Sequence, residues 1–214
     1  MNKWDWVIIA AFIVFFCFCM TFDCFADPTQ APIDNAVRIR RENKGGSSGT
    51  GFLVQDGIVV TNKHCVEYAK VIWVKFADGK WEKIKANATN IYAMDGYDLA
   101  YIRVNQPAPQ QLTVSAEDNY IGREIYMISM PSTYSFRWVT AGIIGSEVVS
   151  MGGFRTNWSA VRAMDLDGRQ GCSGSMILDR ETDELVGVFC GNNNPCMTIM
   201  QDIIQLRELL KDLD

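Results

Sequence analysis

Short apolar segments, separated by turn residues, recur along the chain from residue 36 to about residue 202. They are rich in β-branched and aromatic side chains, and several alternate apolar and polar positions with a period of two, as expected for strands with one buried face. About a dozen such segments, with no amphipathic helical stretch between them, favour antiparallel barrels or a sandwich over a βαβ sheet. The pattern predicts an all-β protein. Only Ile203 to Leu213 has apolar residues at helical spacing, which predicts one short C-terminal helix packed on the β body.

The N-terminal segment follows a different pattern. Trp6 to Phe22 is an almost unbroken apolar run after a short head that contains Lys3. Cys24 and Ala26 are small residues at the third and first positions before a potential cleavage point, so the segment 1–26 is predicted to be a signal peptide. At about 17 residues the run is at the lower limit of what spans a bilayer, and an uncleaved N-terminal membrane anchor is the alternative. Both interpretations predict export, to the periplasm, the medium or the outer side of a membrane.

Composition and charge narrow the classes of function. The 214 residues are 48% apolar and 21% charged, which is typical of a globular domain. We assign residues 27–35 to a Pro-containing lead-in and residues 36–214 to a single folded domain. The formal net charge of −5 argues against nucleic acid as a partner. With one His and no Cys-x-x-Cys pair, a structural metal is not expected.

Four cysteines lie beyond the predicted signal: Cys65, Cys172, Cys190 and Cys196. Export to an oxidising compartment permits disulfides, and three pairings are possible. A bond between Cys190 and Cys196 would close a small local loop. Free buried thiols are the other interpretation, and the spacing does not decide between them.

Three polar positions at the edges of apolar segments are candidates for chemistry. Ser173 stands in a turn, Gly171 to Ser175, directly before a strand-like run. His64, the one histidine of the chain, ends another apolar run, and Asp98 opens a third. Each feature alone is common in ordinary turns. Together they occur in the order His, Asp, Ser, which is one of the chain orders of the acyl-transfer triad.

Five segments carry a resemblance to a known family. Thr61 to Val66, Asp98 to Ile102 and Gly171 to Ser175 resemble the three signature segments of the chymotrypsin-like (trypsin-like, clan PA) serine proteases. Val37 to Asn62 and Ile128 to Ser146 resemble the opening hairpin and a later strand pair of the HtrA (Deg) type. Segments of this kind are specific jointly and in this order rather than singly.

The resemblance covers about residues 36–192 and implies two six-stranded antiparallel β-barrels. It implies an exported serine endopeptidase that hydrolyses protein or peptide substrates through an acyl-enzyme at Ser173, without a cofactor. His64 would be the general base and Asp98 the group that orients it. The backbone N–H groups of Gly171 and Ser173 would form the oxyanion hole. The short stretch after Ser173 leaves no room for the PDZ domain of HtrA proteins, and the oligomeric state stays open.

Two rival assignments lie close to the triad positions. Asp95 competes with Asp98, which we prefer because Leu99 and the strand after it match the family segment. Cys172 competes with Ser173 as nucleophile, but the family pattern places Gly two positions before and one position after the nucleophile, and only Ser173 satisfies it. In the digestive branch an Asp at the position of Cys172 binds the new N-terminal amine after zymogen cleavage, and a cysteine cannot form that ion pair.

The sequence says less about the residues that determine substrate specificity. Asp167 stands where trypsin-like enzymes bind Lys or Arg side chains, although Asp165 matches an HtrA-type Asp outside that pocket, and a solvated loop carboxylate is the plain alternative. Gly191 and Asn192 are expected to border the cleft where substrate adds as an extra strand. Two further functions stay open: a protease-fold binding protein that has lost turnover, and a viral or phage enzyme that processes one polyprotein site.

Overall fold

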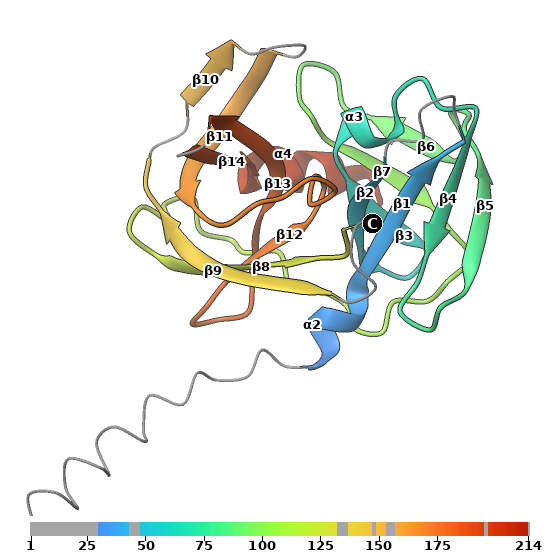
Figure 1. Cartoon of the computed structure of the whole chain (residues 1–214), viewed down its shortest axis with the longest axis horizontal. Helices are drawn as coiled ribbons and strands as arrows, with labels where there is room; N and C mark the ends of the chain where they lie inside the picture. The colour runs from blue at the N-terminus through green and yellow to red at the C-terminus, as the bar shows by residue number, and fades with distance from the viewer. Residues whose placement is uncertain are drawn as a thin grey trace, which may run out of the picture.

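Two antiparallel β-sheets of seven strands each lie side by side in the computed structural model, which describes residues 30–42, 48–131, 137–146, 149–152, 157–194 and 197–213 (Figure 1). The first sheet is coloured blue to green in the figure. Its strands, in chain order, are β1 (Ala36–Arg41), β2 (Ser48–Gln55), β3 (Ile58–Thr61), β4 (Val71–Lys75), β5 (Trp81–Lys85), β6 (Ile91–Ala93) and β7 (Ala100–Arg103). They are arranged in the order β5-β4-β1-β2-β3-β7-β6, which curls the sheet into a half-barrel.

The second sheet is coloured yellow to red. Its strands are β8 (Glu124–Ser129), β9 (Trp138–Ile144), β10 (Val149–Gly152), β11 (Asn157–Asp165), β12 (Met176–Asp179), β13 (Leu185–Asn194) and β14 (Met197–Asp202). Their order is β10-β11-β14-β13-β12-β8-β9. An additional pairing of β9 with β11 closes six of these strands into a barrel and leaves β10 outside the ring.

The strands β2 and β3 of the first sheet have both faces buried, one inside their own sheet and one against the second sheet. Val59 of β3 packs into the interior of the first sheet, whereas its neighbour Val60 belongs to a second apolar cluster that continues into the second barrel. Leu53 and Phe52 of β2 divide in the same way. Successive strand residues point to opposite faces, so a strand buried on both faces reads as a continuous apolar run instead of an alternating one. The shared cluster fixes the two barrels against each other.

Among the described residues, three short helices accompany the sheets: α2 (Gln30–Asn35), α3 (Lys63–Val66) and α4 (Ile203–Leu210), the last followed by a 3-10 turn at Lys211–Leu213. The predicted C-terminal helix is therefore confirmed. Asp202 caps it by accepting a hydrogen bond from the N–H of Ile204 at 3.0 Å. Ile203, Leu206 and Leu209 form its buried face.

Two segments differ from the sequence-based expectation. The lead-in ends in the short helix α2. The Asn35 amide donates to the carbonyls of Leu53 and Gln110, each at 2.6 Å, and these bonds hold the segment on the β body. The segment 111–116, one of the short apolar segments whose pattern predicts strands, makes only one isolated bridge, between Val114 and Leu185. It belongs to the connection between the two sheets, and its backbone bonds to Val54 of β2 and Leu185 of β13 are too few to form a ladder.

The chymotrypsin-like double-barrel architecture is confirmed. The predicted signal peptide, residues 1–26, and Cys196 lie outside the described residues. Within the described ranges, no helix is long and apolar enough to cross a membrane.

Candidate active site

His64 is positioned by the single turn of α3, which follows directly on the end of β3. Its backbone N–H donates to Asp98 Oδ1 at 2.9 Å, and its ring Nδ1 lies 2.7 Å from Asp98 Oδ2. The Asp98 side chain is 2% exposed and the His64 side chain 36%. A buried carboxylate that accepts at both oxygens fixes the ring orientation and keeps the proton on Nδ1, so Nε2 is left as the acceptor.

Asp98 is anchored at the entrance to β7. The Asn62 amide donates to its carbonyl at 2.9 Å, and the Gln201 side chain accepts from its N–H at 3.3 Å. Asp95, the sequence-level rival, is fully exposed and lies 3.6 Å from Lys63 Nζ. Of the two carboxylates, only Asp98 contacts the imidazole.

The electrostatic surroundings favour the charged form of His64. Burial opposes a charge on the ring, but Cys65 and Asp98, through charge and hydrogen bonding, outweigh burial and raise the pKa of His64 above its ordinary 6.5. The imidazolium that forms when His64 accepts a proton is therefore stabilised by its neighbours.

Ser173 lies in the turn that precedes β12 and comes from the second barrel, whereas His64 and Asp98 come from the first. The carbonyl of Ser173 lies 3.6 Å from the thiol of Cys65, the residue next to His64, so the two segments meet between the barrels. The Ser173 hydroxyl donates to the carbonyl of Cys190 on β13 at 3.1 Å. Across the described residues, no hydrogen bond joins Ser173 Oγ to His64.

The backbone around Ser173 adopts conformations that require glycine. Gly171 has a φ of +92° and Gly174 a φ of +87°, in the left-handed region where a Cβ is unfavourable. A Cβ on Gly174 would also stand 2.1 Å from the carbonyl oxygen of Thr50 and 2.3 Å from Thr61 Oγ1. The glycines therefore let the loop lie directly against the strands of the first barrel.

Two donors of this loop are left free. Neither the N–H of Gly171 nor that of Ser173 has an acceptor within the described part of the chain, whereas the N–H groups of Cys172, Gly174 and Ser175 all donate to backbone carbonyls. Two unpaired N–H groups beside a half-buried hydroxyl form an arrangement that accepts an oxyanion.

The predicted specificity residues lie on the neighbouring surface. Asp167 is 59% exposed, and its Oδ2 lies 3.1 Å from the Arg169 guanidinium. The Asn192 side chain donates to the carbonyl of Gly168 at 3.0 Å, and Gly191 pairs with Ile199 on β14. A role in substrate binding stays a prediction for Asp167, Gly191 and Asn192.

The described cysteines are free buried thiols, and burial raises the pKa of Cys190 well above its ordinary value. Cys172, the rival nucleophile, has no exposed surface, whereas Ser173 is half-buried. The Cys190–Cys196 disulfide stays a prediction, because Cys196 is outside the described residues. Within those residues, no group of three His, Cys, Asp or Glu side chains is placed to hold a metal.

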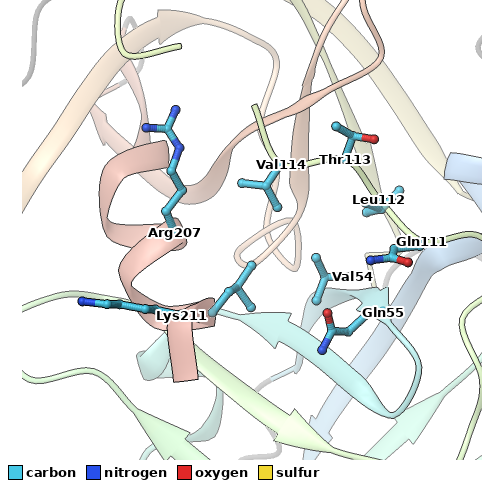
Figure 2. Close-up of a pocket in the computed structure, with 9 residues that line it drawn as sticks. Val54, Gln55, Gln111, Leu112, Thr113, Val114, Arg207 and Lys211 are labelled. Atoms are coloured by element: carbon cyan, nitrogen blue, oxygen red, sulfur yellow. The ribbon is translucent and has the colours of Figure 1, made fainter. Parts of the chain in front are cut away.

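A cavity of about 520 Å³ lies apart from these residues, between β2, the connecting segment 111–114 and the C-terminal helix (Figure 2). Val54 and Leu112 are among its apolar lining residues. Arg207 stands at its rim, but the guanidinium already binds the carbonyl of Ser115 at 2.7 Å and Asp118 at 2.6 Å. The cavity shares no residue with the His64, Asp98 and Ser173 cluster.

Comparison with known proteins agrees with the class of protein that the fold and the site define, the chymotrypsin-like serine proteases. The sequence profile of the trypsin-like peptidase domain matches residues 49–188, and the chain belongs to this family, whose members are serine-type endopeptidases. Among curated proteins, none matches the sequence significantly.

Solved structures share the fold at low sequence identity. The HtrA-type protease AlgW, solved with a tripeptide, has a TM-score of 0.75 and 17% identity over 88% of this chain and 63% of its own. The active form of the Rv3671c protease from M. tuberculosis has a TM-score of 0.73 and 20% identity, over 86% and 83% of the two chains. A serine endoprotease from Yersinia pestis has a TM-score of 0.69 and 19% identity, over 88% and 66%. The chain therefore spans slightly less than two thirds of AlgW and of the Yersinia enzyme, and the HtrA-type resemblance is confirmed at the level of the fold.

Sequence reasoning named His64, Asp98 and Ser173 as candidates but not the residues that contact them. Asn62 and Thr50 contact the carbonyls of the site segments, and Cys190 accepts from Ser173. Asn62 stands inside the family segment next to His64, so its position was a usable signal. Thr50 and Cys190 gave no signal, because their partners are distant in the sequence.

Proposed function

We propose that this chain hydrolyses peptide bonds with His64, Asp98 and Ser173 as a catalytic triad. The observation that carries the proposal is the two-point hydrogen bonding of Asp98 to His64, together with a serine whose own N–H and that of Gly171 have no acceptor among the described residues. A buried carboxylate on Nδ1 keeps Nε2 unprotonated and stabilises the imidazolium, which is what the ring needs when Nε2 must accept a proton from a nucleophile.

The reaction begins with a rotation of Ser173 about χ1. Its hydroxyl leaves the carbonyl of Cys190 and turns to Nε2 of His64, which takes the proton as Oγ attacks the substrate carbonyl. The oxyanion that develops lies against the N–H groups of Gly171 and Ser173, and each donor contributes about 3 kcal/mol. His64 then protonates the leaving amine, and an acyl ester remains on Ser173. Water, deprotonated by His64, attacks this ester, and the acid is released as Oγ recovers its proton.

A second candidate function is a binding protein that has lost turnover. The observation that favours it is the Ser173 hydroxyl itself, which donates to Cys190 instead of His64. The proposed mechanism requires this hydroxyl to rotate from Cys190 to His64, so a chemical test of Ser173 decides between the functions.

The test is labelling with a fluorophosphonate probe, which reacts with activated serines. We expect the protein to be labelled and labelling to disappear in Ser173→Ala and His64→Ala. Cys172→Ala is the matched control and should keep the reaction. An unlabelled but folded protein, or label that survives in Ser173→Ala, would refute the triad.

Export is part of the proposal. The apolar run from Trp6 to Phe22 supports translocation of the domain out of the cytoplasm, and the small residues at Cys24 and Ala26 support cleavage. Mass spectrometry of the N-terminus in each cell fraction tests this. A chain that begins at Asp27 in the periplasm or the medium fits the signal peptide, and an intact chain in the membrane fraction fits the anchor. An intact chain in the cytoplasm contradicts both.

A further inference from the structure

The carbonyl groups of Gly171, Cys172 and Ser173 all accept hydrogen bonds from partners inside the protein. The Gly171 carbonyl accepts from Thr50 Oγ1 at 2.8 Å, and the Ser173 carbonyl accepts from the Thr50 N–H, also at 2.8 Å. The Cys172 carbonyl between them accepts from the N–H of Ser175 at 3.0 Å and from its Oγ at 2.5 Å. Three consecutive peptide groups are thus held by two residues.

This pattern determines where the free N–H groups point. In a trans peptide the C=O and the N–H lie on opposite sides, so a carbonyl held inward directs the N–H of the same peptide group outward. The Cys172 carbonyl and the Ser173 N–H belong to one peptide group, and Ser175 therefore sets the direction of that donor. The peptide group after Gly171 is held at both ends, by Thr50 Oγ1 and by the carbonyl of Arg169 at 3.0 Å from the Cys172 N–H. This bonding fixes the peptide group that follows Gly171, directly next to the peptide group that carries the Gly171 N–H, the second donor.

Both hydroxyls are fully buried and have complete hydrogen bonding. Thr50 Oγ1 also accepts from the Met130 N–H at 3.1 Å, which ties β2 of the first barrel to the end of β8 in the second. Ser175 Oγ lies 2.7 Å from the buried Ser129 Oγ. A hydroxyl has one proton, so Ser129 donates to Ser175, and Ser175 donates to the Cys172 carbonyl. Neither hydroxyl is free to bind substrate.

We propose that Thr50 and Ser175 are positioning residues for the oxyanion hole: their buried hydroxyls hold the peptide groups of the nucleophile loop so that the Gly171 and Ser173 N–H groups face the substrate. Because Thr50 belongs to the first barrel and the loop to the second, the oxyanion hole is assembled only when the barrels are docked. This inference depends on the proposed triad, but it assigns a role to residues outside it.

The test compares Thr50→Val, which removes the hydroxyl at similar size, with Thr50→Ser, which keeps it. Inactivation by a fluorophosphonate probe is resolved into the maximal rate, kinact, and the half-saturating concentration, KI. We expect kinact of Thr50→Val to fall about 10- to 100-fold, less than the 10²- to 10³-fold loss on deletion of an oxyanion donor, because the donor is displaced instead of removed. KI and the pH midpoint of inactivation should not change, and Thr50→Ser should recover most of the rate.

Ser115→Ala is the matched control for a general loss of stability. Ser115 is equally buried, and its hydroxyl donates to Glu184 at 2.6 Å, with no contact to the loop. We expect its melting temperature to fall while kinact stays at the wild-type value. If Thr50→Val does not fold, Ser175→Ala is the second variant, with an expected loss of about tenfold in kinact since the Ser175 N–H still holds the Cys172 carbonyl.

The outcomes separate this inference from the proposed function. A wild-type protein that does not react refutes the triad and, with it, the positioning role. A reactive wild type with unchanged kinact in the folded Thr50→Val or Ser175→Ala variant refutes only the positioning role. A Thr50→Ser variant as slow as Thr50→Val also refutes it, because the hydroxyl would then have no special part.

Discussion

Replacement of Asp98 by asparagine changes the hydrogen bonding of His64 at one atom. In the wild type, Asp98 Oδ2 accepts from Nδ1 at 2.7 Å while Oδ1 accepts from the backbone N–H of His64 at 2.9 Å. An asparagine that keeps its oxygen on the backbone N–H places its NH₂ group against Nδ1. That ring nitrogen must then be the acceptor, and the proton moves to Nε2, where it blocks transfer from Ser173.

The expected cost is large. A triad with the wrong histidine tautomer loses about 10⁴-fold in kcat, equivalent to about 5.4 kcal/mol at 1.36 kcal/mol for each factor of ten. The loss of the Asp98 charge also lowers the pKa of His64, because that charge is one of the causes that raise it. Only the neutral imidazole acts as a base, so kcat/KM rises with pH through the pKa of His64. The wild-type midpoint should lie above 6.5, and the variant midpoint should lie lower, with a much lower plateau.

Two measurements check this expectation. The first is the pH profile of kcat/KM on a peptide substrate found by library screening. The second is a nitrogen-15 NMR titration of the imidazole, which is unambiguous because His64 is the one histidine of the chain. An Asp98→Asn variant within tenfold of the wild type, or an imidazole pKa that does not fall, would contradict the assignment of Asp98. Asp95→Asn is the control, and it should leave both measurements unchanged.

Three further predictions concern stability and specificity. Gly174→Ala should lower the free energy of unfolding in urea by more than 3 kcal/mol or prevent folding. The control, Gly79→Ala, has a similar φ of +84° but nothing within 4 Å of the added carbon, and it should cost about 1 kcal/mol. Equal losses in the two variants would show that the close approach of Gly174 to the first barrel is unimportant. Asp167→Asn should change the preference for Lys or Arg at P1 less than tenfold in peptide-library profiling, because the carboxylate is exposed and already paired with Arg169. A hundredfold loss of that preference would place Asp167 in the specificity pocket. Arg162→Ala should cost about 3 to 5 kcal/mol in the same urea titration, because it leaves the buried Asp202 carboxylate without its partner; a loss below 1 kcal/mol would refute a contribution from the pair.

The sequence allowed the prediction of the strands and of the polar residues at their ends. Strand periodicity depends on neighbours along the chain, and the segment around His64 carries its own signature. The predicted preference for Asp98 over Asp95 agrees with the contact to His64, because the strand that follows Asp98 fixes where its carboxylate lies.

What the sequence did not indicate depends on contacts between distant segments. Thr50 reads as one small residue in a Gly/Ser-rich stretch, and its role appears only when β2 lies against the nucleophile loop. The segment 111–116 has the composition of a strand but forms only an isolated bridge instead of a continuous ladder. Tertiary context therefore overrides its local preference. The rotamer of Ser173 depends on the Cys190 carbonyl, which no local pattern reveals.

The division of the site between the barrels has a consequence for biosynthesis. A ribosome that has completed the first barrel has made His64, Asp98 and Thr50 but not Ser173, the proposed nucleophile. Ser173 emerges next, and β12, β13 and β14 must still follow before the second barrel can close around it. Under the proposed mechanism, hydrolytic activity therefore arises only after β14 has been synthesised and the two barrels have met, so a nascent chain that has not reached β14 cannot cleave its neighbours.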